Sequence, residues 1–356
     1  MKKFWIKGNS RVKIGATYVG PGYPTFFIAE IGINHNGDIS IAKELILKAK
    51  KAGANAVKFQ KRVSSEIFTE SMLKESYIGP NSYGSTYGEH RAALEFSFNQ
   101  YSELKKYADQ HDILFFASVW DEKSVDFMND LGVHAFKIAS ADAVNLRLID
   151  KVINSSKPIL ISTGMSTKKE IELVVKHVRK LTKKFIFFHS TSLYPANHES
   201  LNLAFMNKLK EICGPNPIGY SGHESDLLPS LIAVSLGAAI VERHVTLDKG
   251  AKGSDHSASL LPEEFGELIS WSKQYQVILG DSTKPELSDE LLRMRRKLGK
   301  SLYYASNLPK GHKISFHDIK LLSPGDGISP LVEKRYIRRR LRRSVLAQQP
   351  FSDEDF

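Results

Sequence analysis

The sequence predicts a (β/α)₈ TIM barrel followed by a small, mostly β domain. Short apolar, β-branched segments recur along the first 250 residues, with amphipathic, helix-like segments between them. A polar linker near residue 280 ends this series. The chain has 356 residues. That length suits one barrel of about 250 residues plus a further domain of roughly 60–100.

The segments with the composition of buried parallel strands account for the barrel prediction. Strand and helix alternate with a period of roughly 20–30 residues, which favours a closed barrel over an open sheet. Several helix-like segments end in a glycine (Gly53, Gly132 and Gly237), as a left-handed helix terminus requires. The predicted strands are Phe26–Gly32, Ala56–Lys61, Leu114–Val119, Ala135–Ser140, Pro158–Gly164, Phe185–Ser190, Pro217–His223 and Ala239–Leu247.

Two segments interrupt this alternation. Residues 62–96 form a long insertion after the second strand, and loops of this length are usually functional lids. Residues 280–285 form the polar linker, and beyond it Ser301–Ala305 and Lys313–Leu322 resemble short strands. We therefore expect a barrel domain over residues 1–280, a linker over 281–292 and a small β domain over 293–356.

The composition is that of a globular protein, with 42% hydrophobic and 25% charged residues. The longest largely apolar run, 231–241, has about half of the ~20 residues that a membrane span needs. The basic residues 1–7 are not followed by the apolar stretch of a secretory signal. Cys213 is the only cysteine, which excludes an internal disulfide and fits a reducing compartment. We expect a cytoplasmic protein with no membrane partner.

The net charge of +11 is concentrated at one end of the chain. Residues 293–356 contain fifteen Lys and Arg against six Asp and Glu, and the densest stretch is 334–343. Such a surplus can indicate nucleic-acid binding, but no aromatic stacking pattern or binding motif accompanies it. We therefore expect no nucleic-acid partner, and interpret the charge as a solvated or partner-facing surface that serves an acidic substrate.

Polar residues lie at the carboxyl ends of the predicted strands, where the active site of a barrel gathers. Charged groups within apolar segments are costly unless they are paired, so these positions predict a site. The residues are Glu30, Lys58, Gln60, Ser118, Lys137, Ser140, Asp142, Ser162, Ser192, Tyr194, Ser221, His223, Glu242 and His244.

Two histidines are candidates for metal binding. His223 and His244 close the last two strands, which are neighbours about 4.8 Å apart in a parallel ladder. Imidazoles at equivalent depth on such strands can share one metal ion at about 2.1 Å each. Glu30 and Asp255 could complete the metal shell or bind substrate. The alternative is that each histidine is a core residue without a ligand, which their pairing beside Glu242 disfavours.

Two lysines are candidates for anion binding. Lys58 and Lys137, with the hydroxyls of the nearby serines, match an anion with two charged ends, such as phosphoenolpyruvate. The alternative is that both lysines extend along the barrel rim towards solvent. Asp142 and Glu242 are the remaining acid or base candidates. These residues alone do not distinguish an aldolase, a synthase and a hydrolase.

Six ordered motifs resemble the sialic acid (nonulosonate) synthase family. They are IAEIGINHNGD (28–38), VKFQ (57–60), KIAS (137–140), STGM (162–165), YSGH (220–223) and ERH (242–244). The tail is similar to the family's antifreeze-like (SAF) domain, through SLY (301–303), LPKGH (308–312) and SPGDG (323–327).

The resemblance implies a synthase that condenses phosphoenolpyruvate with an N-acetylmannosamine-type aldose and releases phosphate. It implies a divalent cofactor, Mn²⁺ or Mg²⁺, held by His223 and His244, and catalytic roles for Glu30, Glu242 and Lys137. It also implies a domain-swapped homodimer in which the antifreeze-like domain closes over the partner's barrel. The implied substrate contacts are Lys58, Gln60, Ser118, Ser140, Asp142, Ser162, Ser192, Tyr194, Ser221 and Asp255.

Three departures from the family pattern concern the acceptor sugar. Asp142 stands where many members have Glu, Ser192 where some have Asn, and Ser323 where many bacterial members have Arg. The acceptor therefore stays open between N-acetylmannosamine, a diacetamido-trideoxy sugar and mannose. One alternative is a sugar-phosphate-using synthase of the same class, whose metal-dependent members use a cysteine early in the barrel. Another is a non-catalytic carbohydrate-binding protein, which would be expected to have lost a metal ligand or a lysine.

Overall fold

The computed structural model describes residues 10–280 and 283–356, and the chain divides into two compact units after Gly280. The expectation for residues 1–7 and the first two positions of the expected linker, 281–282, lie outside the described residues. None of the helices in the described ranges is long and apolar enough to cross a membrane.

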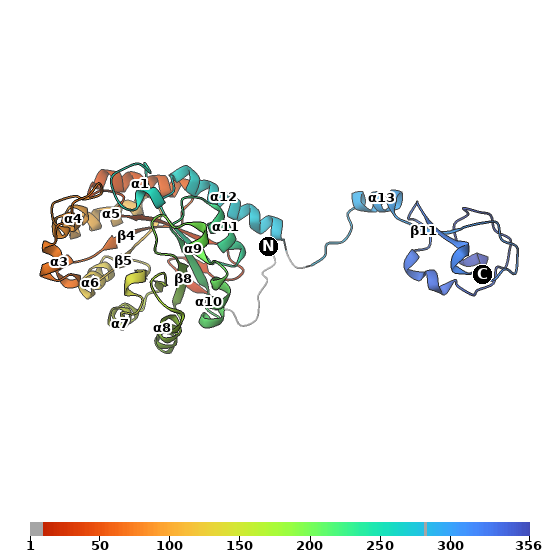
Figure 1. Ribbon diagram of the computed structural model, residues 1–356, viewed down its shortest axis with the longest axis horizontal. Coiled ribbons are helices and arrows are strands. Elements are labelled where there is room, and N and C mark those ends of the chain that lie inside the picture. Colours follow the sequence, from red (N-terminus) through yellow and green to blue (C-terminus); the bar gives the residue numbers. More distant parts are fainter. Residues whose placement is uncertain (1–9, 281–282) are drawn as a thin grey trace. The chain divides into compact units, whose positions relative to one another are not determined.

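The first unit contains a closed barrel of eight parallel strands, which confirms the predicted fold class (Figure 1). Neighbouring strands follow one another around the ring, and β10 closes it against β3. The predicted bounds are confirmed for β3, β4, β5 and β8, whereas the other four strands are shorter than predicted. The strands are β3 (Phe26–Gly32), β4 (Ala56–Lys61), β5 (Leu114–Val119), β6 (Phe136–Ile138), β7 (Ile159–Ser162), β8 (Phe185–Ser190), β9 (Ile218–Gly222) and β10 (Ile240–His244).

Helices surround the barrel and bury one face each against it (Figure 1). In α8, for example, Ile171, Val174, Val175 and Val178 recur at helical spacing and are buried. Most of these helices begin at a side-chain cap, such as Asp38 before α1. The layer consists of α1 (Ile39–Ala52), α5 (Phe98–Gln110), α6 (Glu122–Asp130), α7 (Leu146–Asn154), α8 (Lys168–Leu181), α10 (Phe205–Cys213), α11 (Leu228–Ser235) and α12 (Pro262–Leu279).

The amino-terminal end of the barrel is closed by a hairpin of β1 (Val12–Ile14) and β2 (Thr17–Val19). Three of its residues, Val12, Ile14 and Val19, belong to the main hydrophobic core. Its turn residue Gly15 lies against Leu114 and His134, at the beginnings of β5 and β6. The opposite end, where the strands finish, is therefore the open mouth.

The insertion after β4 is an ordered segment with three short helices. They are α2 (Ser64–Ile67), α3 (Glu70–Lys74) and α4 (Tyr87–Leu94). The Tyr83 hydroxyl donates to the Lys252 carbonyl at 2.5 Å, and the Asn81 side chain accepts from Gly253 N at 3.2 Å. These bonds hold the insertion against the loop that follows β10, so it forms one wall of the mouth.

The second unit has a core of its own and only one pair of antiparallel strands, β11 (Ser301–Tyr304) and β12 (Ile319–Leu322). The predicted strand Lys313–Leu322 is wrong in its first half. There, Ser315 N and Oγ both donate to Asp318 Oδ2 at 2.8 Å, which winds residues 316–318 into a 3₁₀ turn. Helix α13 (Asp289–Leu298) spans the expected boundary between linker and second domain at 292/293.

An ion pair lies fully buried on the outside of the barrel wall. Arg243, in the middle of β10, contacts Glu224 at 2.8 Å, and both side chains have 0% exposure. Arg243 also donates to Ser230 Oγ at 2.9 Å, and Tyr220 donates to Glu224 Oε2 at 2.9 Å. Because each charge has several partners, the pair fixes α11 and the loop after β9 against the strands.

We predict that Arg243→Met lowers the free energy of unfolding by about 3–5 kcal/mol, since it leaves the Glu224 carboxylate buried and unpaired. Urea denaturation followed by circular dichroism measures the loss. The control is Arg147→Met, because Arg147 pairs with Glu122 at the surface with 87% of its side chain exposed. Equal stability of the two variants would show that the buried pair is not required.

Candidate active site

A cavity of about 320 Å³ lies at the carboxyl ends of the strands. All but one of the residues singled out from the sequence line it, although they come from every strand of the barrel or the loop after it. They are Glu30, Lys58, Gln60, Ser118, Lys137, Ser140, Ser162, Ser192, Tyr194, Ser221, His223, Glu242, His244 and Asp255.

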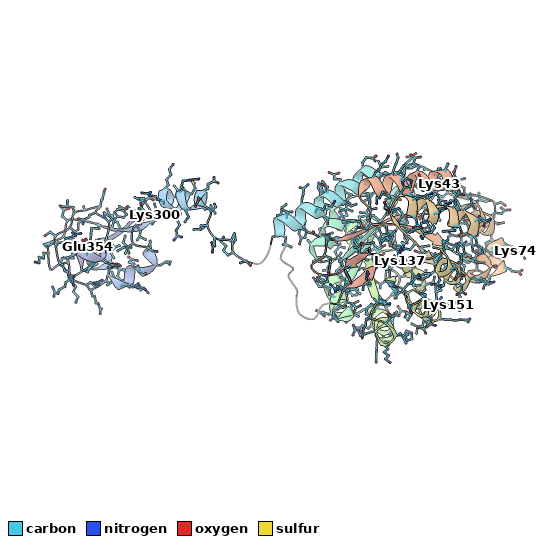
Figure 2. All side chains as sticks on the ribbon, turned by 180° about the vertical axis from the view of Figure 1, so that it is seen from behind. Lys43, Lys74, Lys137, Lys151, Lys300 and Glu354 are labelled. Carbon is cyan, nitrogen blue, oxygen red and sulfur yellow. The ribbon has the colours of Figure 1, made fainter. Side chains whose placement is uncertain are left out.

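Four ionisable side chains form the floor of the cavity. Lys58 Nζ lies 2.6 Å from Glu30 Oε2 and 3.7 Å from Glu242 Oε1, and Lys137 Nζ lies 2.8 Å from the same Glu242 oxygen. All four side chains are at most 5% exposed. Figure 2 shows Lys137 within the barrel, whereas Lys43, Lys74 and Lys151 lie at the periphery. The snorkelling alternative for Lys58 and Lys137 is therefore wrong.

The two carboxylates of this floor have different environments. Burial raises the pKa of Glu242, but Lys137 and Lys58 outweigh it and lower the pKa to about 2. Burial raises the pKa of Glu30, and here Lys58 does not reverse the effect. Burial also lowers the pKa of Lys137, against the pull of Glu242. Glu242 is thus held ionised, while Glu30 binds a proton more readily.

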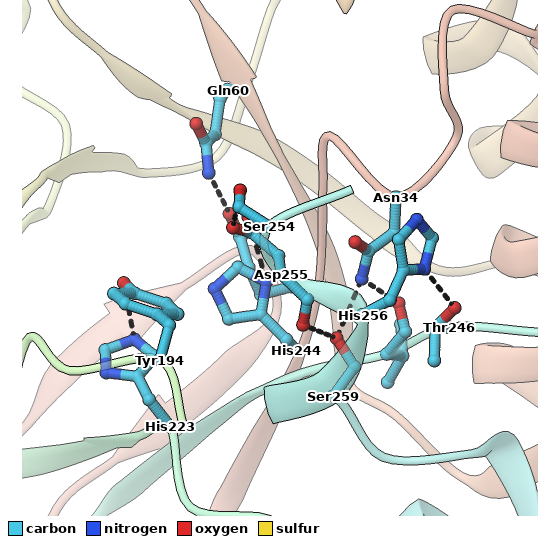
Figure 3. A network of polar contacts seen from close by, with 12 residues as sticks. Asn34, Gln60, Tyr194, His223, His244, Thr246, Ser254, Asp255, His256 and Ser259 are labelled. Atoms are coloured by element: carbon cyan, nitrogen blue, oxygen red, sulfur yellow. Dashed lines mark hydrogen bonds and ion pairs between the residues drawn. The ribbon is translucent and has the colours of Figure 1, made fainter. Parts of the chain in front are cut away.

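The two histidines lie side by side at the mouth, with ring centroids 5.6 Å apart (Figure 3). His223 Nδ1 donates to the Thr191 carbonyl at 2.7 Å, so its Nε2 carries the lone pair and accepts from Tyr194 at 2.9 Å. Burial, followed by the neighbouring His244, lowers the pKa of His223 to about 3. His223 is therefore a neutral imidazole that lines the cavity, with its Nε2 lone pair bound to the Tyr194 hydroxyl.

His244 Nδ1 is buried and has no hydrogen-bond partner, since Asp255 Oδ2 lies 3.8 Å away. Asp255 is held by its backbone, because its carbonyl accepts from Ser259 at 2.7 Å and Ser259 accepts from Asn34 at 2.8 Å (Figure 3). Within residues 10–280 and 283–356, no group of three or more His, Cys, Asp or Glu has the arrangement of a metal site. The protein thus offers two imidazoles, with a carboxylate close by.

The hydroxyls of the cavity include two with no hydrogen-bond partner and one with its own proton unused, among the described residues. Ser162 Oγ and Ser190 Oγ are buried and lack a hydrogen-bond partner among the described residues. Ser140 Oγ accepts from Gly164 N at 3.0 Å, which leaves its own proton free to donate. A Cβ at Gly164 would lie 2.5 Å from Ser192 Oγ, so the glycine allows these hydroxyls to converge. Free donors beside two lysines suit an anion with several oxygens.

Asp142 is the candidate that the structure places elsewhere. It ends the 3₁₀ turn Ser140–Asp142 and accepts from Asn145 Nδ2 at 3.1 Å. Its side chain lines a neighbouring cavity with Trp120 and Asp121, although the turn directs Ser140 into the main cavity. The two cavities share Trp120, so Asp142 lies next to the site without lining it.

Sequence analysis missed several residues that line the main cavity. Ser190 ends a predicted strand, and Arg62 follows another by one residue. Including the last residue of every predicted strand and the residue after it would have found both. Trp120 follows β5 by one residue and carries the same signal, whereas Arg91 had none, because it lies in α4 of the insertion. The further lining residues are Ile33, Ala139, Ala141, Met165 and Ser254.

We predict that the stability contributed by Glu242 disappears in acid. Its pKa falls from an ordinary 4.5 to about 2 on folding, so between these pH values the unfolded state binds more protons. The difference in free energy of unfolding between the wild type and Glu242→Gln should decrease by up to about 1.4 kcal/mol per pH unit as the pH falls through this range. A difference that is constant from pH 6 to 2.5, measured by urea denaturation, would contradict the assignment.

Known proteins resemble this chain over most of its length. Residues 45–284 match the model of the NeuB family. The chain is 42% identical to human N-acetylneuraminate-9-phosphate synthase over 294 residues, 83% of this chain and 82% of that one. It is 35% identical to N,N'-diacetyllegionaminic acid synthase of Legionella pneumophila over 346 residues, 96% and 97% of the two chains.

A solved structure with the same fold is the N-acetylneuraminic acid synthetase of Leptospira borgpetersenii. It is 32% identical, with a TM-score of 0.71, and the match covers 82% of this chain and 98% of that one. These matches confirm the predicted resemblance and the prediction that the chain is an enzyme. The chain belongs to the NeuB family.

Proposed function

We propose that this enzyme condenses phosphoenolpyruvate with an N-acetylmannosamine-type aldose, releases phosphate and forms a nonulosonic acid. One observation carries the proposal. Two lysines, two unpartnered hydroxyls and further serines converge in the cavity that has His223 and His244 at its rim. The relatives named above, which make sialic and legionaminic acids, support the same reaction.

Phosphoenolpyruvate fits the deep part of the cavity. Lys58 and Lys137 would hold its two anionic groups, as charge-assisted hydrogen bonds from lysine to carboxylate and phosphate oxygens are among the strongest available. The hydroxyls of Ser118, Ser140, Ser162, Ser190, Ser192 and Ser221 surround these lysines in the cavity and would donate to the remaining oxygens.

A divalent cation fits the rim. The tautomer of His223 leaves its Nε2 lone pair shared only with the Tyr194 hydroxyl, which a cation could displace, and His244 Nδ1 is buried without a partner among the described residues. Imidazole ligands suit transition ions better than Mg²⁺, so of the two candidates we favour Mn²⁺. When bound, the cation polarises the aldehyde carbonyl of the open-chain sugar.

The two carboxyl groups, Glu30 and Glu242, carry out the proton transfers. Carbon 3 of phosphoenolpyruvate forms a bond to the aldehyde carbon, and Glu30 donates a proton to the aldehyde oxygen. Water then adds to the cationic carbon 2 and gives a proton to Glu242, whose Oε2 is buried and has no hydrogen-bond partner among the described residues. The bond between carbon 2 and the phosphate oxygen then breaks, the proton of the new carbon 2 hydroxyl passes to the leaving phosphate, and carbon 2 becomes the keto carbon of the product.

The second unit is, in this proposal, an antifreeze-like domain that closes over the barrel of a partner subunit in a domain-swapped homodimer. Its basic stretch is partly structural, as Arg343 contacts Asp355 at 2.7 Å and Arg339 lies over the Phe356 ring. Ser323 accepts from Lys300 and carries no charge of its own. We propose that this domain excludes water, and that the enzyme acts in the cytoplasm.

We predict that His223→Ala removes metal binding and turnover together. Dialysis against Mn²⁺ followed by metal analysis should find the ion on the wild type and not on the variant, and chelation of the wild type should abolish phosphate release reversibly. His198→Ala is the control, because His198 pairs with Asp226 at the surface and does not line the cavity. A chelated enzyme or a His223→Ala variant with full activity would refute the metal site.

We predict that the reaction breaks the bond between carbon and oxygen. Phosphoenolpyruvate labelled with ¹⁸O at the bridging position should transfer the label to released phosphate, as measured by mass spectrometry. The same assay with N-acetylmannosamine, a diacetamido-trideoxy hexose and mannose identifies the acceptor by product mass. Label retained in the sugar acid would show cleavage between phosphorus and oxygen and would contradict the proposal.

A further inference from the structure

Two arginines line the cavity without a role in the reaction proposed above. Arg62 directly follows β4, and Arg91 belongs to α4 of the insertion, yet both face the cavity that contains Lys58 and Glu30. The two deep lysines are matched by two carboxylates at 2.6 and 2.8 Å. The arginines therefore form a separate positive group nearer the wall.

Arg62 is held rigidly beside the charged floor. It is only 4% exposed, and its guanidinium lies 4.5 Å from the centre of the Trp120 ring. It donates to Gln60 Oε1, and Gln60 Nε2 donates to Glu30 Oε1 at 3.2 Å. Gln60 also lies close to His244, because both side chains would contact a Cβ at Gly32. One side chain thus separates Arg62 from the rim where the aldehyde is proposed to bind.

Arg91 has no acidic partner in the part of the chain that the structure describes. Its Nε and Nη2 both donate to the Tyr87 hydroxyl, at 2.9 and 2.7 Å, and its guanidinium lies over the same ring. These bonds occupy one edge of the Arg91 guanidinium and orient it, but they do not neutralise its positive charge.

The carboxylates near these two arginines do not neutralise their positive charges. Glu95 Oε2 lies 3.9 Å from Arg62 Nε, but the other oxygen of Glu95 binds Lys61 at 2.6 Å. Asp142 faces the neighbouring cavity, and burial raises its pKa. The pKa of Arg62 is lowered by burial and then by Arg91, as expected of like charges close together. A partly buried pair of cations is costly unless an anion joins it.

We infer that Arg62 and Arg91 form an anion subsite for a phosphate monoester at the end of the acceptor sugar remote from its aldehyde. The inference rests on the proposed function and narrows it to phosphorylated aldoses. Guanidinium groups bind phosphate in a bidentate manner, which a neutral hydroxyl would not exploit. In the proposed reaction phosphoenolpyruvate is bound by the two lysines, and Gln60 lies between Arg62 and Glu30, the partner of Lys58.

The test compares N-acetylmannosamine with N-acetylmannosamine 6-phosphate in the full chain supplied with Mn²⁺ and phosphoenolpyruvate. We expect the wild type to prefer the phosphorylated sugar. Arg91→Ala should lower kcat/KM for that sugar by roughly 10- to 150-fold, the worth of a hydrogen bond between charged groups. Its effect on kcat/KM for the neutral sugar and on the KM for phosphoenolpyruvate should be much smaller than this loss.

The control is Lys123→Ala, which removes a positive charge that pairs with Glu66 and does not line the main cavity. It should behave as the wild type with both sugars. Because Arg91 is only half-buried, its variant avoids the destabilisation expected for buried Arg62. Calorimetric binding of both sugars to the wild type and Arg91→Ala provides a measurement that does not depend on turnover.

The outcomes separate this inference from the proposed function. Equal use and equal binding of both sugars by the wild type would overturn the subsite while leaving the synthase reaction intact. A raised KM for phosphoenolpyruvate in Arg91→Ala, with no effect on sugar preference, would overturn it as well. A third outcome is a wild type that turns over neither sugar and yet binds the phosphorylated sugar more tightly than the neutral one. If Arg91→Ala removes that difference in binding, the proposed reaction is refuted and the subsite is supported.

Discussion

The burial of four charges inside the barrel is the constraint on which the rest of the site depends. Glu30, Lys58, Lys137 and Glu242 would each cost several kcal/mol if they were buried alone. The strand register prevents this, because Glu30 lies opposite Lys58 on the neighbouring strand and Glu242 reaches both lysines. A bound anion would have to compete with carboxylates already in place, so the lysines are oriented before any substrate arrives.

Successive side chains of strand β10 point to opposite faces of the barrel wall, so this strand contributes to both stability and chemistry. Glu242 and His244 point into the cavity, whereas Arg243 between them points outward into its buried ion pair with Glu224. A shift of one residue in the register of β10 would exchange these faces. The outer ion pair therefore opposes any slip that would displace the two inner groups, and the same few residues fix both sides of the wall.

Much of this arrangement was predictable from the sequence because it follows from local patterns. Apolar, β-branched runs identified every barrel strand, and reading their carboxyl ends found the charged floor and both histidines. Predicted strands were too long at both ends of β6, β7, β9 and β10, because composition does not mark where the ladder hydrogen bonds begin and stop. Asp142 was misplaced because a 3₁₀ turn after β6 redirects alternate side chains, which strand periodicity does not reveal.

The missed residue that no strand end could reveal is Arg91, whose position depends on tertiary contacts of the insertion. Arg91 is far in sequence from any strand end, and it reaches the cavity only because Tyr83 and Asn81 fasten the insertion to the loop after β10. That same loop holds Asp255 beside His244. The insertion and the β10 loop thus form one wall, so a change in either would alter the space for the sugar and leave the charged floor in place. Sugar preference can therefore vary in this wall independently of the reaction at the strand ends.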